Sequence, residues 1–216
     1  MGTSPSSSGP DTPHQLTHTP QDQVYFAIVQ KVNVTSNSQL LSNPAFAAEA
    51  AQSYLTNQTG PLASVSGDLF GWEKVPQPNR ARLSNSTLAQ LAQFPSDWPE
   101  IEYVPIDIVV PPTGAAPTDN FIAFGVALLT PISRGNVTIT STDTSVSPLI
   151  NPNWLFEKAD QEVAIQAFQR IREITDYSGI VLEEVAPGPS VQSDADVLTW
   201  IQDNASLIYH ASATCE

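Results

Sequence analysis

The sequence predicts an α+β domain, with strands early in the chain, amphipathic helices late and a hairpin between them. Apolar side chains alternate along residues 24–32, which is typical of a strand with one buried face. Residues 121–129, a Ser-Arg-Gly turn and residues 137–139 predict an antiparallel hairpin. After Asp160, apolar residues recur at helical spacing, at Val163, Ala167, Phe168, Ile171 and Ile174.

The first half of the chain begins with a segment that we expect to be disordered. Residues 1–20 are mostly Ser, Thr, Pro and Gly without periodicity, so they cannot bury enough apolar surface to fold. Asn43 and Pro44 predict the cap and first turn of a helix that ends at Gly60-Pro61. An irregular segment over 67–78, a short helix around 87–93 and a second strand over 101–110 follow.

The second half contains the predicted hairpin and two helices. Residues 121–129 are apolar on both faces, which predicts a central strand. Residues 149–155 are interpreted as a connector, and the long helix begins with Asp160 as its cap. A last helix extends from Ser193 to about Asn204, where Ser193 and Asp196 have the spacing of a capping box.

Composition excludes several classes of function. The 216 residues include 8 Lys+Arg and 22 Asp+Glu, a formal charge of −14, so there is no basic stripe for nucleic acid or an anionic membrane. No apolar run approaches the ~20 residues of a membrane helix. A single cysteine excludes an intramolecular disulfide. Five sequons indicate a glycosylated, extracellular or secretory protein, at Asn33, Asn57, Asn85, Asn136 and Asn204. Because no signal peptide follows Met1, we expect the natural start to lie upstream.

Several well-known sites are absent from the sequence. No two glycines stand two residues apart, which excludes the dinucleotide fingerprint, and the phosphate-binding Gly-x-x-x-x-Gly-Lys loop is missing as well. The serine hydrolase elbow Gly-x-Ser-x-Gly does not occur. His14 and His18 have the spacing of a helical metal pair, but Pro13 and Pro20 disfavour a helix there. Glu183 and Glu184 are interpreted as a solvated edge rather than an acid–base pair, since neighbours on an extended segment face opposite ways.

The chemistry is concentrated in residues 208–215, which hold His210 and Cys215. His210 is either a hydrogen-bonded structural residue beside Tyr209 or a general base, since an imidazole with a pKa near ~6.5 accepts protons near neutral pH. Cys215 is either a nucleophile paired with His210 or a buried small residue. The residues alone leave both alternatives open.

The C-terminal segment Tyr209-His210-Ala-Ser-Ala-Thr-Cys215 resembles the Tyr-His-x-x-x-Thr-Cys motif of the glucose–methanol–choline (GMC) oxidoreductases. Four further stretches are similar to family motifs in the same order: Asn57-Gln-Thr-Gly-Pro-Leu62, Phe94-Pro-Ser-Asp-Trp-Pro-Glu-Ile-Glu-Tyr103, Ser133-Arg-Gly-Asn-Val-Thr-Ile139 and Pro148-Leu-Ile-Asn-Pro-Asn-Trp-Leu155. The resemblance covers residues 21–216. At Gln21-Asp22-Gln23 the family commonly has Asp-His, so the sequence departs from the pattern there.

The resemblance implies a substrate-binding half, a largely antiparallel sheet with helices packed on one side, set against a separate flavin-binding half. It implies FAD as the cofactor and an alcohol CH–OH group as the electron donor. His210 would abstract the hydroxyl proton while flavin N5 accepts the hydride, and Tyr209 would lie near the isoalloxazine. The FAD-binding half and a second active-site residue lie outside residues 21–216, so we expect a truncated region that is inactive alone.

Two other functions compete with this interpretation. One is a non-catalytic binding or interaction module with an aromatic-lined pocket around Phe70, Trp72 and Trp98 for a small ligand. The other is a glycosidase, which would need two carboxylates ~5–10 Å apart. The sequence identifies neither the alcohol nor the electron acceptor, and it places no metal site in the chain.

Overall fold

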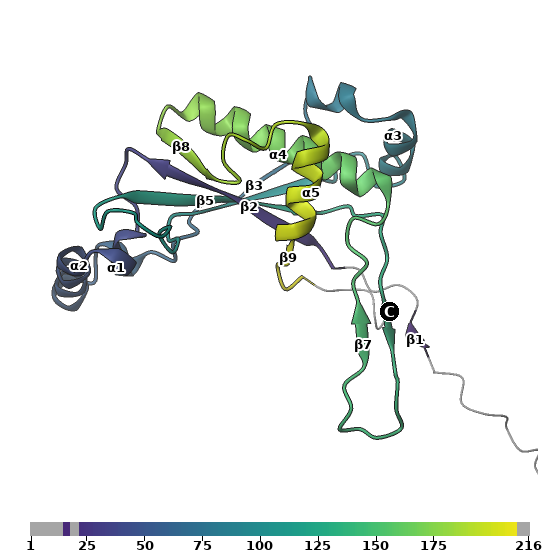
Figure 1. Ribbon diagram of the computed structural model, residues 1–216, viewed down its shortest axis with the longest axis horizontal. Coiled ribbons are helices and arrows are strands. Elements are labelled where there is room, and N and C mark those ends of the chain that lie inside the picture. The colour runs from purple at the N-terminus through teal and green to yellow at the C-terminus, as the bar shows by residue number, and fades with distance from the viewer. Residues whose placement is uncertain (1–14, 18–21, 211–216) are drawn as a thin grey trace, which may run out of the picture.

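The computed structural model describes residues 15–17 and 22–210 (Figure 1). Its strands are β1 (Gln15–Thr17), β2 (Val24–Val32), β3 (Gly71–Glu73), β4 (Ile101–Ile106), β5 (Asn120–Leu128), β6 (Asn136–Thr138), β7 (Leu149–Asn151), β8 (Val181–Ala186) and β9 (Ser206–Leu207). Its α-helices are α1 (Gln39–Ser42), α2 (Pro44–Asn57), α3 (Asn85–Leu91), α4 (Lys158–Ser178) and α5 (Asp194–Asn204), and short 3₁₀ turns cover Pro61–Ala63 and Asn79–Arg82.

The main sheet of the described residues is antiparallel and has six strands, in the order β3-β4-β5-β2-β8, with β9 paired to the start of β2. β5 lies between β4 and β2, so the prediction that residues 121–129 form a central strand is confirmed. Val126 and Ala127 of β5 are completely buried. The central position explains why this strand is apolar on both faces.

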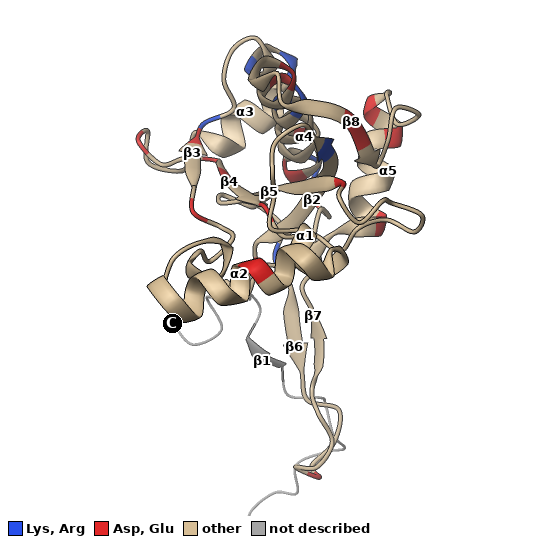
Figure 2. Cartoon of the chain, turned by 90° about the vertical axis from the view of Figure 1, so that its left-hand side faces the viewer, with Lys and Arg blue, Asp and Glu red and all other residues tan. Residues whose placement is uncertain are grey.

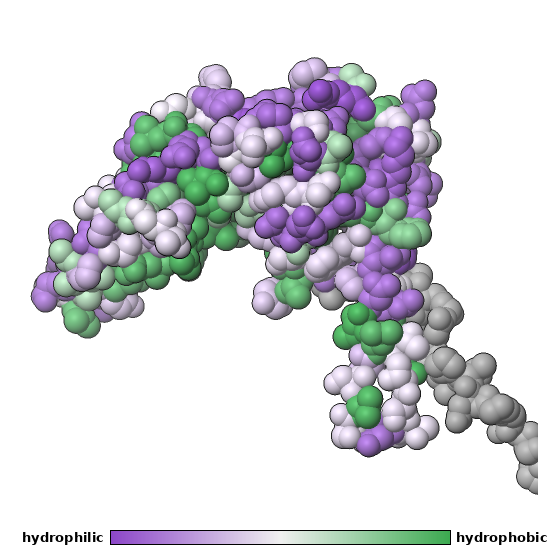
Figure 3. All heavy atoms as spheres, in the orientation of Figure 1, coloured by the Kyte–Doolittle hydropathy of each residue, from purple (hydrophilic) through white to green (hydrophobic). Residues whose placement is uncertain are grey.

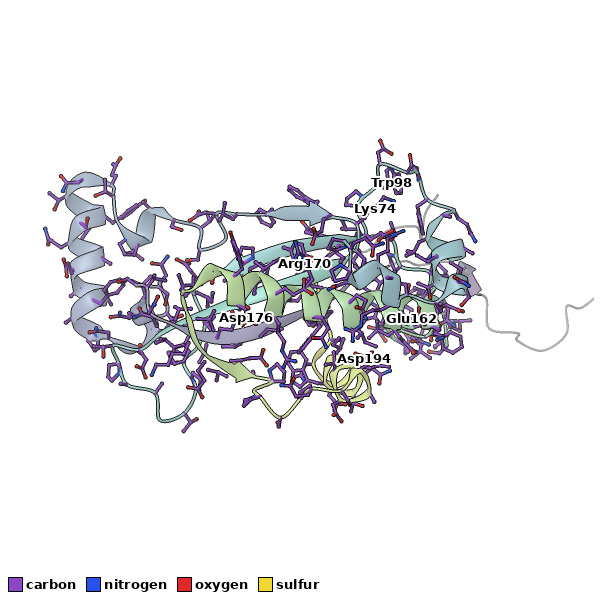
Figure 4. All side chains as sticks on the ribbon, turned by 90° about the horizontal axis from the view of Figure 1, so that it is seen from above. Lys74, Trp98, Glu162, Arg170, Asp176 and Asp194 are labelled. Atoms are coloured by element: carbon purple, nitrogen blue, oxygen red, sulfur yellow. The ribbon has the colours of Figure 1, made fainter. Side chains whose placement is uncertain are left out.

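The hydrophobic core lies between the sheet and α4, which crosses the strands from above (Figure 4). Phe26 of β2 and Phe168 of α4 stack with their ring centroids 6.5 Å apart. Trp200 of α5 meets Phe168 edge to face at 5.7 Å, and the Arg172 guanidinium lies 4.5 Å from the centre of the same ring. The predicted α+β class, with helices packed on one side of an antiparallel sheet, is therefore confirmed.

The predicted hairpin between residues 121–129 and 137–139 is wrong. β6 pairs with β7 and β1 in a separate three-stranded sheet, while β5 is saturated by β2 and β4. After β5 ends, Pro131 has no backbone N–H and therefore cannot donate the hydrogen bond that would continue strand pairing. The Asp160 carboxylate then accepts the backbone N–H groups of Ile132 and Ser133 at 2.7 and 2.8 Å. Asp160 was predicted as the cap of α4, but the N-cap position is Glu157.

Helix starts were predicted better than strand extents. The Asn43 side chain accepts the N–H of Phe46 at the start of α2, and Ser193 accepts the N–H of Asp196 at the start of α5, as predicted. The predicted strand over 101–110 ends at Ile106, the connector over 149–155 contains β7, and the irregular segment over 67–78 contains β3. Sequence analysis missed β8 altogether.

The sheet face opposite α4, which we call the lower face, is flanked by two projections (Figure 1). α1 and α2 form one, and the β6–β7 arm forms the other. The Ser38 hydroxyl fixes α1 to the sheet because it donates to the Phe121 carbonyl and accepts the Val109 N–H, at 2.8 and 2.9 Å. α2 packs lightly, with Ala50 as its buried residue.

Glu162 joins α4 to the start of α3 (Figure 4). Burial alone would raise the pKa of this carboxyl, but hydrogen bonds from Thr87, Ser84 and Lys158 outweigh burial and lower the pKa of Glu162 to about 2. The pKa of a free glutamate is 4.5, so the stabilisation is complete above that pH and is lost as the pH falls through about 2.

Replacing Glu162 by glutamine should therefore lower the free energy of unfolding at neutral pH. The free energy of unfolding of the variant should also fall less than that of the wild type as the pH is lowered from 4.5 to about 2. We expect a loss on the order of 2 kcal/mol in the free energy of unfolding at pH 7, after allowance for solvent screening, and no loss near pH 2. Urea unfolding between pH 7 and pH 2 measures this. The exposed Glu183→Gln is the control, and an equal loss at every pH would contradict the assignment.

The predicted tail and some candidate residues lie largely outside the described residues. Within residues 1–20, Gln15–Thr17 form β1, which pairs with β6, and the division of the chain at residue 20 stays a prediction. His14, His18 and Cys215 are outside the described ranges. Within those ranges no helix is long and apolar enough to span a membrane.

Candidate functional site

The register of the sheet assigns a set of side chains to the lower face. Phe26 and Ile28 point to the core under α4, so the alternate residues of β2 point the other way. Residues that are paired across neighbouring strands share a face of the sheet. The pairs therefore assign small residues to the centre of the lower face and larger ones around them. These residues are Tyr25, Ala27, Ala123, Gly125, Ala127, Glu102, Val104 and Trp72.

His210 lies at the end of this face where β2 begins. β9 pairs with Val24 and Tyr25, and the chain then turns through Tyr209, whose φ of 62° is left-handed. This turn brings the His210 Nδ1 within 2.8 Å of the Gln23 Oε1. Continuing the alternation of β2, Gln23 projects to the same side as Tyr25. The imidazole is exposed rather than wedged among apolar side chains.

The contact with Gln23 selects the tautomer of His210. An amide oxygen can only accept a hydrogen bond, so Nδ1 carries the proton and the neutral ring presents an unprotonated Nε2. The sequence departs from the family pattern at this position, yet Gln23 supplies a local partner for the histidine. Tyr209 beside it is 89% exposed, so its ring is available to a second molecule.

Asp22 adds a negative group close to His210. Burial raises the pKa of Asp22, and the Gln23 backbone N–H and the nearby His210 charge lower it in part. The Asp22 Oδ1 is buried and has no hydrogen-bond partner among the described residues, while the Trp154 indole N–H donates to the Asp22 carbonyl at 3.1 Å. The Asp22 carboxyl group and the His210 ring therefore lie close enough to interact electrostatically.

The centre of the lower face combines small residues with two polar groups that the sequence analysis did not single out. The Tyr25 ring lies over Gly125, where a Cβ would collide with the tyrosine hydroxyl. Burial raises the pKa of Tyr25. Glu102 is 8% exposed. The alternation of β2 and β4 was the signal that could have assigned both residues to one face.

The other candidates are not brought to this site. Glu184 is not solvated as predicted, because Arg172 donates to both of its oxygens at 2.6 and 2.8 Å, while Glu183 is exposed at the sheet edge. The aromatic rings form two separate stacked pairs, Phe70 with Trp72 and Phe94 with Trp98. Trp98 thus stacks with Phe94, and the aromatic pocket around Phe70, Trp72 and Trp98 stays a prediction.

Three hollows on the described part of the chain have no lining residue in common with the surroundings of His210. One of about 220 Å³ is lined by residues from Ser66 to Leu69 and by the far ends of β4 and β5. The described residues hold no group of three or more His, Cys, Asp or Glu side chains that could bind a metal ion.

Charge and hydropathy distinguish the lower side from the helical side. Charged residues gather around α4, α5 and β8, whereas α2 and the β6–β7 arm are almost free of them (Figure 2). Hydrophobic residues line the lower edge between α2 and the body (Figure 3). The arm exposes apolar side chains, with Leu149 61% and Ile150 66% accessible. Such surfaces are typical of contact sites.

Comparison with known proteins relates this arrangement to a family. Residues 131–216 match the family model described as GMC oxidoreductase. The glucose methanol choline oxidoreductase atC of Aspergillus terreus is 42% identical over 194 residues, which are 90% of this chain and 32% of that protein. Patulin synthase of Penicillium expansum is 39% identical over 209 residues, 90% of this chain and 33% of the relative.

This chain contains a GMC-family C-terminal region. It spans about a third of the length of the curated relatives it matches. Solved structures agree in fold: formate oxidase of Aspergillus oryzae superposes with a TM-score of 0.76 at 18% identity, over 92% of this chain and 37% of the other. An FAD-dependent oxidoreductase of Chaetomium thermophilum gives 0.70 at 21% identity, over 91% and 38%.

The residues of this GMC region fit one end of the family cofactor. FAD needs a phosphate cradle at a glycine-rich strand–helix turn, and the sequence has no such turn. Tyr209 and His210 are exposed beside the lower face and could contact the reacting end of a flavin.

Proposed function

We propose that this chain forms the substrate-binding part of an FAD-dependent oxidoreductase that oxidises an alcohol CH–OH group, with His210 as the proton acceptor. The observation that carries the proposal is the His210–Gln23 contact of 2.8 Å, which leaves Nε2 of an exposed imidazole free to accept a proton. FAD, when bound, supplies the two-electron acceptor for this reaction.

The residues of this chain would bind and deprotonate the alcohol. The hydroxyl would donate to Nε2 of His210, and the proton would move to that nitrogen as the carbon is oxidised. Gln23 would hold the ring in position through Nδ1, with the Asp22 carboxyl group close to the same ring. Tyr209 would contact the isoalloxazine.

The partner of the lower face would be the flavin-binding half. The chain covers a third of its relatives, and its lower side, between α2 and the β6–β7 arm, is apolar and poor in charge. A second polypeptide surface placed there would exclude water from His210. Alone, the chain would present His210 to solvent without an electron acceptor, so we expect it to be inactive.

A chimera tests the proposal. This chain would replace the matching third of the Aspergillus terreus relative, and the purified chimera, the chain alone and the truncated relative would be compared. We expect a flavin absorption spectrum and alcohol-dependent dye reduction from the chimera, and neither from the chain alone. A chimera that holds stoichiometric flavin but reduces no dye with any of a broad panel of alcohols would refute the proposal.

The second candidate is a binding module without catalysis. The exposed Phe70–Trp72 pair favours it, since the two rings stack at 6.2 Å with more than half of each side chain accessible. Aromatic ligands would bind to this pair in the chain alone. Binding without any turnover in the flavin-loaded chimera would support this candidate over the oxidoreductase.

The same proposal includes glycosylation and an extracellular or secretory location. Four sequon asparagines are exposed, at Asn33, Asn57, Asn85 and Asn204, while Asn136 in β6 is half-buried. We expect carbohydrate on the exposed positions when the protein is made by a fungal secretory host. Intact mass before and after endoglycosidase treatment measures it, and an unchanged mass would contradict it.

A further inference from the structure

Gln30 of β2 is a buried amide that is hydrogen-bonded at one end only. It is 2% exposed, and its Nε2 donates to the Thr175 hydroxyl of α4 at 2.9 Å. That hydroxyl donates in turn to the Ile171 carbonyl at 2.9 Å, so it can only accept from the amide and therefore faces the nitrogen. The Gln30 Oε1 is left without a donor among the described residues. A buried acceptor without a donor is costly, so a donor from another molecule would stabilise it.

Gln30 lines a hollow of about 460 Å³ between the last turns of α4 and the edge strand β8. Asp176 of α4 and Leu182 and Glu183 of β8 line the same hollow and are exposed, so solvent enters it. The terminal torsion of a glutamine side chain is broad, so the amide can turn about it to meet a donor in the hollow. The hollow therefore brings an unpaired acceptor within reach of a small molecule.

The charge of this hollow is negative. Arg172 donates to both oxygens of Glu184, at 2.6 and 2.8 Å, so the charges of these two lining residues offset each other. Asp176 and Glu183 form no ion pair within the described part of the chain. The end of α4 acts in the same direction, because its last turn has no basic residue to offset the partial negative charge of the helix C-terminus. A cation is therefore the favoured occupant.

An organic ammonium ion fits these groups better than a metal ion. Within the described ranges, no three His, Cys, Asp or Glu side chains come together as metal ligands. An ammonium group has three N–H donors, which can serve the amide oxygen of Gln30 and the carboxylate of Asp176 together. Val181 and Leu182 add apolar surface to the same hollow, which suits a short alkyl chain.

We propose that this hollow binds a short alkylammonium ion, whose ammonium group donates to the Gln30 Oε1 and to the Asp176 carboxylate. Gln30 lies seven positions after Gln23, or roughly 20 Å along an extended chain, and points to the core side of the sheet rather than to the lower face. The binding therefore involves neither His210 nor flavin, and it stands or falls independently of the proposed function.

The test titrates the full 216-residue chain with three small molecules and follows the Gln30 side-chain amide and the backbone amides of β8 by NMR. The probes are n-butylammonium chloride, its neutral isostere 1-butanol, and tetramethylammonium chloride, which has the charge but no N–H donor. We expect n-butylammonium to bind about 10- to 100-fold more tightly than 1-butanol. Tetramethylammonium should bind about tenfold more weakly than n-butylammonium, because it cannot donate to Oε1.

Two variants remove one half of the site each. Gln30→Leu deletes the unpaired oxygen and should lower the affinity for n-butylammonium about tenfold, while that for 1-butanol hardly changes. Asp176→Asn deletes an exposed charge and should have an effect of the same order without disturbing the fold. Asp203→Asn, on the exposed side of α5, removes an equal charge elsewhere and should leave all three affinities unchanged.

Melting temperatures show whether each variant is folded, and if Gln30→Leu is not, Asp176→Asn decides alone. The proposal is overturned if n-butylammonium binds the wild type no more tightly than 1-butanol, or if the folded variants keep the wild-type preference. Oxidation of alcohols by the chimera bears on the proposed function only, so failure of one proposal is distinguishable from failure of the other.

Discussion

Replacing His210 by alanine in the flavin-loaded chimera should lower the rate of alcohol oxidation about 10²- to 10⁴-fold, the range by which a positioned general base accelerates proton transfer. The structure gives the reason: Gln23 fixes Nδ1, so Nε2 is the free acceptor of an exposed ring. The measurement is dye-linked turnover at saturating alcohol, with flavin content determined from the visible spectrum of the same sample. Flavin content should not change.

Two further variants show whether the effect belongs to this imidazole. Gln23→Leu removes the acceptor for Nδ1 and leaves the ring, so we expect a smaller loss, about tenfold, from a histidine that is no longer held in one tautomer. His18→Ala, in the predicted tail, changes another histidine and should leave turnover intact. Full activity of His210→Ala with normal flavin content would exclude His210 as the base.

Phe168→Ala should have the largest effect on stability, a loss of about 3–5 kcal/mol in the free energy of unfolding. The Phe168 ring is completely buried, stacks on Phe26, meets Trp200 edge to face and lies under the Arg172 guanidinium. Its removal leaves a cavity where α4, α5 and the sheet meet. Urea unfolding followed by tryptophan fluorescence measures the loss, because Trp200 reports on the same contact.

Phe156→Ala is the matched control for this substitution. Phe156 precedes α4 and is 68% exposed, so the same chemical change there should cost less than about 1 kcal/mol. If both variants lost equal stability, the core would not be centred on the α4–sheet contact. A Phe168→Ala variant that kept wild-type stability would contradict the packing described above.

The fold was predictable where a local signal determined the local structure. The alternation of residues 24–32 gave β2 with its exact bounds, and the Asn43 and Ser193 caps located two helix starts. Which strands pair with one another was not predictable from such local signals. The apolar character of residues 121–129 indicated a central strand, but its partners are β2 and β4 rather than the nearest strand in sequence. Asp160 was misassigned because its carboxylate caps a neighbouring loop instead of its own helix.

The site was predictable only in part, and for a physical reason. His210 and Tyr209 were proposed as site residues from a short motif, and this stays a prediction. Gln23 lies 187 positions from His210 in sequence and meets it because β9 pairs with the start of β2. Glu102 was one of 22 acidic residues, and nothing local distinguished it. Its burial arises from the row of side chains that four strands bring together.

The pairing of β2 also has a consequence for how the polypeptide acquires its structure during synthesis. β2 precedes its partners β5, β8 and β9 in the sequence, so it leaves the ribosome before any of them. At about 5–20 residues per second, the ribosome would need roughly 10–30 s to deliver the pairing of Val29 with Ala186. Contacts between such distant segments slow folding, so one edge of β2 stays unpaired until β8 and β9 have been synthesised.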